Sequence, residues 1–272
     1  MIRLLTRTEH GEYHFREFHS DGTPAYAILS HTWEQDNWHE VLYDDVLGRS
    51  GHDKRGYKKL DFCANQAAID GLAFFWVDSC CINKRSEVEL SEAINSMFSW
   101  YKNAARCYVY LSDVPRRGDK HSERDQHDAV DVYENDIRVS RWFKRGWTLQ
   151  ELLAPQDVIF YTHHGHKIGT KSSMDILLHE VTSIPREALG GRSLADFSVD
   201  QRLSWIEKRR TTREEDMVYS LLGIFDVNMT LIYGEGRKRA LRRLWRAIDD
   251  NLDGEAVTLH ANLGAQRLIR HR

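Results

Sequence analysis

The stretch AYAILSHTW (residues 25–33) decides the fold, because it is the first of several short apolar runs that end in polar residues. Runs of this kind are typical of strands that are buried on both faces of a sheet. The pattern returns in LAFFWVDSCCI (72–82), in CYVYLSDV (107–114) and in DVIFYT (157–162). Because strands buried on both faces are characteristic of parallel sheets, these stretches predict a parallel sheet.

Two amphipathic segments separate the first three predicted strands. KRGYKKLDFCANQAAIDG (54–71) and ELSEAINSMFSWYKNA (89–104) both place apolar residues at helical spacing. Strands that alternate with helices indicate an α/β fold with helices on both faces of the sheet. The first 24 residues are polar with scattered apolar positions, and we expect a hairpin that caps this fold.

The sequence pattern changes in the rest of the chain. Residues 115–139 are dense in charged side chains and predict a solvated insertion loop. From about residue 172 the pattern becomes helical, with candidates at 172–184, 198–210, 211–225 and 236–252, and with capping-box spacing at Ser198–Gln201 and Thr212–Glu215. We therefore expect an α/β core over 1–165, a helical part over 166–253 packed on it, and a weakly patterned tail over 254–272.

The composition excludes several classes of protein. Hydrophobic residues make up 41% of the chain, which suits a globular core, and the net charge of −3 gives no sign of a nucleic-acid partner. No run is long enough to span a bilayer, and the start lacks a signal-peptide core. The four cysteines show no disulfide-scaffold spacing, so we expect a cytoplasmic protein with reduced thiols.

An acid stands in the aromatic stretch SRWFKRGWTLQELLAP (140–155). One interpretation is a capping box, with Thr148 as N-cap and Glu151 satisfying backbone donors at the start of a short helix. The other is a functional carboxylate in an aromatic cleft at the carboxyl edge of the sheet, where doubly wound folds bind ligands. The two interpretations are compatible, because a capping carboxylate keeps one oxygen free.

Polar residues also follow the first two predicted strands. Ser30, His31 and Trp33 end the first, and Asp78 to Lys84 end the second, where they either line a crevice or serve as loop starters and caps. Cys80 and Cys81 are expected to be buried apolar side chains, since no CxxC motif is present. The cluster His163, His164 and His166 has no matching ligand spacing, so we predict no metal.

Three of these blocks together resemble the signature of the fungal heterokaryon incompatibility (HET) domain. They are AYAILSHTW, the long block FFWVDSCCINKRSEVELSEAINSMFSWYKNAARCYVYLSDV, and SRWFKRGWTLQELLAP. FSVDQRLSWIEKRRTTREEDMVYSLLGIFDVNMTLIYGEG resembles the continuation of that domain in large incompatibility proteins, so the resemblance covers about residues 1 to 245. It implies a trigger of programmed cell death after non-self recognition, and a nucleotide-binding receptor as a possible partner.

The core also resembles TIR domains, which implies a TIR-like, flavodoxin-like parallel sheet flanked by helices. SRWFKRGWTLQEL is similar to the TIR block that carries the catalytic glutamate of NAD-cleaving members, and the match places that role on Glu151. The resemblance implies NAD as substrate rather than cofactor. We expect Ser30, His31, Trp33 and Asp78 to line its pocket, and Trp33 and Trp147 to stack on its rings or close the cleft. The resemblance also implies self-association, because TIR enzymes work as oligomers.

A non-enzymatic adaptor that triggers death by recruiting partners is the alternative. In an enzyme, Glu151 should face a cleft near His31 or Trp33. In an adaptor, backbone donors could engage Glu151 fully, and an exposed apolar patch would be expected elsewhere. A third interpretation, nucleic-acid binding through the basic residues 237–246, lacks a recognisable base-reading module.

Overall fold

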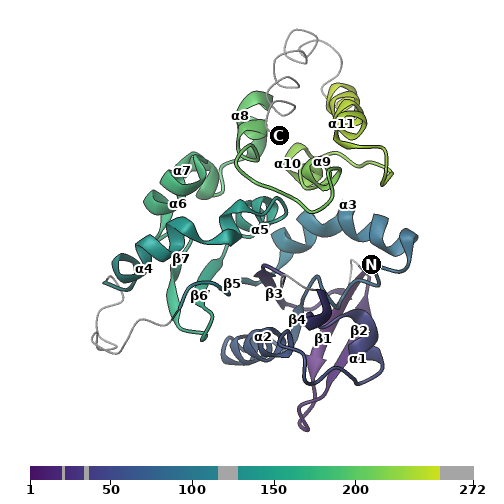
Figure 1. The fold of residues 1–272 in the computed structure, drawn as a ribbon, viewed down its shortest axis with the longest axis vertical. Coiled ribbons are helices and arrows are strands. Elements are labelled where there is room, and N and C mark those ends of the chain that lie inside the picture. The colour runs from purple at the N-terminus through teal and green to yellow at the C-terminus, as the bar shows by residue number, and fades with distance from the viewer. Residues whose placement is uncertain (20–21, 34–36, 116–127, 252–272) are drawn as a thin grey trace.

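A seven-stranded mixed sheet forms the centre of the protein (Figure 1). The computed structural model describes residues 1–19, 22–33, 37–115 and 128–251. The strand order is β2-β1-β4-β3-β5-β6-β7. Four inner strands run parallel to one another and are β4 (Phe74–Trp76), β3 (Tyr26–His31), β5 (Arg106–Leu111) and β6 (Val158–Thr162). All four strands predicted from the apolar runs are therefore confirmed.

Both edges of the sheet are antiparallel, which corrects the prediction of a wholly parallel sheet. At one edge, β1 (Ile2–Arg7) pairs antiparallel with both β2 (Tyr13–Phe18) and β4. At the other edge, β7 (Lys167–Thr170) pairs antiparallel with β6, so the sheet continues past residue 165. The expected N-terminal hairpin exists, but it extends the sheet instead of capping the fold. Antiparallel strands need only a short turn between them, which suits additions at an edge.

Helices cover the two faces of the sheet (Figure 1). On one face lies α2 (Tyr57–Ile69), whose Phe62 ring makes edge contacts with Tyr108 and Tyr161 on β5 and β6. On the other face lie α3 (Glu87–Asn103) and α5 (Thr148–Leu153). The Tyr101 ring of α3 packs edge-on against Trp76 of β4, with ring centroids 5.8 Å apart. The helices predicted at 54–71 and 89–104 are thus confirmed.

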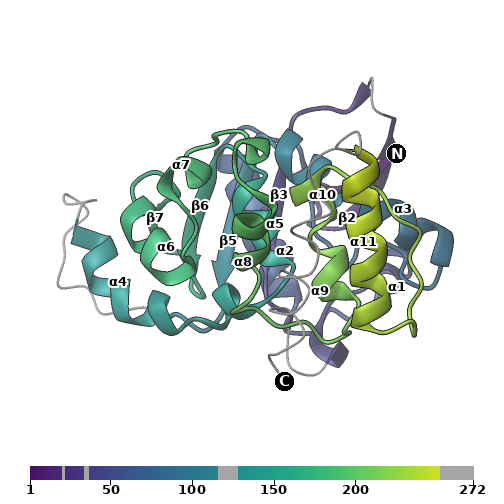
Figure 2. The ribbon, with the colours of Figure 1, turned by 90° about the horizontal axis from the view of Figure 1, so that it is seen from above.

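The C-terminal part is helical and packs on the core, with α9 (Asp216–Tyr219), α10 (Leu222–Phe225) and α11 (Arg237–Asn251) over α3 (Figures 1 and 2). The helix expected over 211–225 is two short helices. The predicted capping box at Ser198 is present, with Gln201 N–H donating to its hydroxyl. The helices of this part are α6 (Asp175–Thr182), α7 (Arg186–Leu189), α8 (Val199–Ser204), α9 (Asp216–Tyr219), α10 (Leu222–Phe225) and α11 (Arg237–Asn251).

Two further local expectations are corrected. Within the expected loop 115–139, α4 (Asp128–Val139) is a helix, while residues 116–127 lie outside the described residues, as does the tail 254–272. Thr212 and Glu215 do not form a capping box, because Glu215 Oε1 instead accepts from the N–H groups of Gly234 and Gly236, each at 2.9 Å. The remaining short helices are α1 (Tyr43–Leu47) and the 3-10 turns Asn37–His39, Arg141–Lys144 and Leu194–Asp196.

Close contact between α10 and α3 gives a test of this packing. A Cβ added at Gly223 would lie 2.1 Å from Phe98 Cβ, so Gly223→Ala forces the two helices apart. We expect it to lower the free energy of unfolding by about 1–3 kcal/mol, as overpacking does. The measurement is urea unfolding beside Gly22→Ala, whose added methyl meets nothing within 4 Å. Equal stability of both variants would contradict the described packing.

Candidate functional site

The carboxyl ends of β3 and β5 meet at the point where the strand order reverses. After β3 the chain builds β4 on one side and then returns to place β5 on the other. Thr32 and Ser112 follow these two strands, and their hydroxyl oxygens lie 3.1 Å apart. Open α/β sheets bind ligands at such a switch point, outside the carboxyl ends of the strands.

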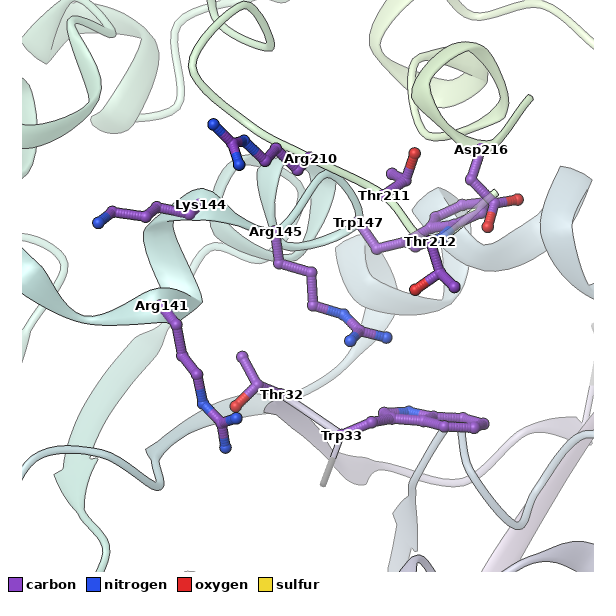
Figure 3. A pocket seen from close by; sticks show the side chains of 10 residues that line it. All are labelled: Thr32, Trp33, Arg141, Lys144, Arg145, Trp147, Arg210, Thr211, Thr212 and Asp216. Carbon is purple, nitrogen blue, oxygen red and sulfur yellow. The ribbon is translucent and has the colours of Figure 1, made fainter. Parts of the chain in front are cut away.

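A pocket of about 340 Å³ opens there (Figure 3). Three segments build it: the end of β3, the turn before α5, and the segment that leads into α9. Cationic and aromatic side chains dominate the wall. The lining residues are Thr32, Trp33, Arg141, Lys144, Arg145, Trp147, Arg210, Thr211, Thr212 and Asp216.

Backbone pairing joins the C-terminal part to this pocket. Arg210 N–H donates to Lys144 O at 2.6 Å, and Gly146 N–H donates to Arg210 O at 2.8 Å. The approach is so close that a Cβ at Gly146 would lie 2.5 Å from Thr211 Cγ2. Gly146 therefore permits the contact that completes the pocket.

A buried arginine reinforces the same junction. The Arg209 guanidinium donates from Nη1 to Arg145 O at 3.0 Å and to Thr148 Oγ1 at 2.7 Å, and the residue is 4% exposed. Burial lowers the pKa of Arg209 to about 10, against the attraction of Glu151. Arg209 thus ties the C-terminal part to the start of α5.

Glu151 is buried on α5, a helix in which every residue is buried, and it is 6% exposed. Ser30 Oγ donates to Glu151 Oε2, and Trp142 Nε1 donates to Ser30 Oγ at 2.9 Å. The capping box predicted for this helix is wrong. Thr148 is not the N-cap, and its hydroxyl donates to Trp142 O at 2.6 Å and to Arg145 O at 2.8 Å.

The surroundings of Glu151 favour its neutral form. Burial, followed by repulsion from Asp78, raises the pKa of Glu151 to about 8, although the Ser30 hydrogen bond opposes the change. At neutral pH the side chain is therefore mostly a carboxylic acid. It does not line the pocket, whose wall begins at Thr32, just beyond Ser30 on the same strand.

A second set of polar side chains lies around His31. The ring nitrogens of His31 lie 3.6 Å from Glu40 Oε2 and 3.7 Å from Asp78 Oδ1. Asp78 Oδ2 accepts from Trp33 Nε1 at 2.8 Å, and the Lys84 ammonium lies 3.6 Å from the Trp33 ring centroid. Burial opposes the ionisation of Asp78, but cations led by Lys84 outweigh it and lower its pKa. His31 and Asp78 thus support Trp33, which lines the pocket.

A buried ion pair between Lys59 and Glu40 holds the backbone just after β3. Lys59 Nζ donates to Glu40 and also to Thr32 O at 3.0 Å. Both side chains of the pair are nearly inaccessible, at 3% and 1% exposure. Burial disfavours the charge on Glu40, but His31 and Lys59 together hold its pKa well below its usual range.

Comparison with known proteins identifies the family. Residues 26–151 match the family described as heterokaryon incompatibility protein (HET). The chain carries a HET domain. It is 50% identical over 244 residues to vegetative incompatibility protein HET-E-1 of Podospora anserina, an alignment that covers 89% of this chain and 18% of that protein. The chain therefore spans about a fifth of the length of this relative. No solved structure matches it.

The HET resemblance inferred from the sequence is confirmed, and the predicted site residues fall into three places. Trp33 and Trp147 line the pocket, Ser30 contacts Glu151, and His31 and Asp78 lie beneath Trp33. The cations of the pocket were not predicted, although SRWFKRGWT and RRTTR carry them as basic residues around aromatic or hydroxyl side chains. Those cations are Arg141, Lys144, Arg145 and Arg210, with buried Arg209 behind them.

Two other expectations concern the cysteines and membrane-spanning helices. All four cysteines are free and buried, so Cys80 and Cys81 are packed side chains as predicted. Among the described helices of this HET protein, none combines the length and the apolar character that crossing a membrane would need.

Ionisation of Glu151 should be visible in the stability of the HET protein. Its folded pKa of about 8 exceeds the ordinary 4.5, so its stabilising effect is complete below pH 4.5 and is lost as the pH rises through about 8. Glu151→Gln removes this loss. We expect the variant to gain stability relative to the parent across that window, by on the order of 5 kcal/mol at most, since the two pKa values differ by about 3.5 units and one unit is about 1.4 kcal/mol.

Urea unfolding at a series of pH values measures this difference. Glu187→Gln, at an exposed position on α7, is the matched control and should track the parent. A constant gap between Glu151→Gln and the parent at every pH would contradict the raised pKa.

Proposed function

We propose that this HET protein is a cell-death effector in fungal non-self recognition, and that it hydrolyses the nicotinamide–ribose bond of NAD with Glu151 as the catalytic carboxylate. The HET domain and the name of its relative, a vegetative incompatibility protein, support the biological role. The enzymatic step is supported by the site.

The observation that carries the proposal is the place and partners of Glu151. Its carboxyl group is buried behind the switch-point pocket and is held by Ser30 instead of by backbone donors of its own helix. A carboxyl whose only work was capping would bind N–H groups at the helix start. Perturbed titratable groups next to a pocket are candidates for catalysis.

Strand order supports a TIR-like core. In chain order, the parallel strands β4-β3-β5-β6 read second, first, third, fourth, which is how the flavodoxin-like order begins. SHTW ends β3, and SRWFKRGWTLQEL leads into α5, as the TIR resemblance implies. The antiparallel edges at β1 and β7 are additions to that arrangement.

The chemistry requires one ionised carboxylate. When the bond between ribose C1′ and the nicotinamide nitrogen breaks, its electron pair leaves with the nitrogen, so nicotinamide departs neutral and needs no general acid. An oxocarbenium-like ribose remains, which an adjacent carboxylate stabilises. Water then adds to C1′ and loses a proton, which gives ADP-ribose, or a hydroxyl of the same molecule adds and gives a cyclic isomer.

The substrate itself would favour that ionisation. NAD brings a positively charged nicotinamide ring, and a nearby positive charge lowers the pKa of a carboxyl group. Because Glu151 is 6% exposed, the proposal includes displacement of pocket-lining side chains as substrate enters. Trp33 and Trp147 are placed to pack against the rings of the ligand.

Glu151→Gln is the direct test of the enzymatic proposal. It keeps the shape and an acceptor oxygen but removes the charge, so we expect loss of NAD cleavage by about 100-fold or more, as when a key electrostatic group is lost. NAD consumption by the purified protein at high concentration is the measurement, because self-association is part of the proposal. Glu187→Gln should retain the parent rate.

Cells distinguish the adaptor alternative. If Glu151→Gln is folded and still kills cells as the parent does, killing does not need cleavage, and recruitment of partners would replace the enzymatic proposal. If the variant is harmless while Glu187→Gln kills, the carboxylate is required for the death signal. A longer receptor that contains a nucleotide-binding region is the partner we propose for either case.

The pH dependence offers an independent test. If ionised Glu151 is the active form, kcat/KM should rise tenfold per pH unit below about 8 and level off above it. The midpoint in kcat should lie lower, because the bound cationic ring favours the carboxylate. A kcat/KM that is flat between pH 6 and pH 9 would remove Glu151 from this role.

A further inference from the structure

Four cations line the pocket. Figure 3 shows Arg141, Lys144 and Arg210 along one side of it and the Arg145 guanidinium at its centre. Over the described ranges, no carboxylate lies within salt-bridge distance of any of the four. Most of the arginines elsewhere that carry ion pairs do so at the surface, such as Arg138 with Glu134 and Glu180. Like charges collected in one concave site repel one another and favour an anion.

The one carboxylate among the lining residues, Asp216, offsets only part of this charge. Asp216 accepts a hydrogen bond from Tyr233 Oη at 3.0 Å, and the indole of Trp147 is a second partner. Burial raises its pKa, which further disfavours a negative charge there. The pocket therefore presents a net positive wall to whatever enters it.

The opposite side of the pocket is aromatic. Figure 3 shows Trp33 and Trp147 on the side away from Lys144 and Arg210. The Lys84 ammonium covers one face of the Trp33 ring, at 3.6 Å from the centroid, and the indole N–H is held by Asp78. The ring is therefore fixed in orientation before any ligand binds. A ligand that combines a flat ring with a multiply charged anion would match the aromatic side and the cationic side of the pocket.

We propose that this pocket binds a nucleotide through its diphosphate, which Arg145 and Arg141 of the core and Arg210 of the C-terminal part contact together. A volume of about 340 Å³ lies in the range of small-molecule sites. The inference rests on the proposed function in one respect, because the ADP half of NAD is one source of this chemistry and a free nucleotide is the other. Binding is nevertheless separable from cleavage.

The bound diphosphate would bridge two parts of the chain. Arg210 belongs to the segment that joins the core through backbone bonds to Lys144 and Gly146, and Arg141 Nη2 donates to Ser112 after β5 at 3.0 Å. Figure 3 shows the Arg210 guanidinium turned away from Arg145, so in this proposal it turns toward the anion and adds charge-assisted hydrogen bonds across the junction. Occupancy therefore stabilises the packing of the C-terminal part on the core.

Calorimetric titration with ADP tests the proposal. We expect the parent to bind ADP and not adenosine, which has the same ring without the anion, and we expect added salt to weaken the binding. Arg145→Gln and Arg210→Gln should each weaken ADP binding about tenfold or more, the loss expected when a hydrogen bond to a charged group is removed. Lys238→Gln, an exposed cation on α11, should bind ADP as the parent does.

Any of three results would overturn the proposed nucleotide site. The folded parent does not bind ADP, it binds adenosine as tightly as ADP, or both arginine variants bind ADP with unchanged affinity. Circular dichroism and thermal melts without ligand establish that the variants are folded, and Lys144→Gln provides a further cation variant if either is not. ADP binding that NAD displaces, with no cleavage of NAD, would leave the nucleotide site standing and refute the proposed enzymatic function.

Discussion

The hydrogen bond between Ser30 and Glu151 joins the sheet to the helix that covers it at the site. A buried carboxyl without partners costs several kcal/mol, so its donors must be placed by the fold. Ser30 supplies one from β3, and Trp142 in turn donates to Ser30 from the turn before α5. These contacts fix where β3 ends relative to α5, and with it the position of the pocket that opens beyond Thr32.

A second constraint is the charge on Arg209, which is buried and must also be satisfied. It donates to Arg145 O and Thr148 Oγ1, so it fixes the backbone of the turn that carries three of the pocket cations. Two acidic groups near the site show how negative charge is kept from the pocket, because Glu40 is paired with Lys59 and Glu151 is mostly neutral. These two acids therefore do not neutralise the cations that line the pocket.

Sequence patterns determined the centre of the fold and the family. The strands at 25–33, 72–82, 107–114 and 157–162 were recognisable because strands buried on both faces must be apolar along their length. The helix stripes of α2 and α3 follow from the spacing of residues that face the sheet. The same blocks carry the HET signature, so family membership could be inferred from the order of residues alone. The antiparallel strands β1, β2 and β7 at the two ends of the sheet have mixed polarity, and their pairing could not be deduced from local pattern.

Only the tertiary structure decided the roles of individual side chains in the site. The spacing of Thr148 and Glu151 fits a capping box. In the structure Glu151 instead accepts its hydrogen bond from Ser30, because Ser30 lies opposite Glu151 once α5 is packed on β3. The cations that face the pocket come from segments far apart in the chain, and Gly146 lets Arg210 approach them. Spacing along a sequence reports which residues share a strand or helix face. It does not report which faces meet, because that depends on how the whole chain buries its apolar surface, and here it is that packing which turns scattered basic residues into one site.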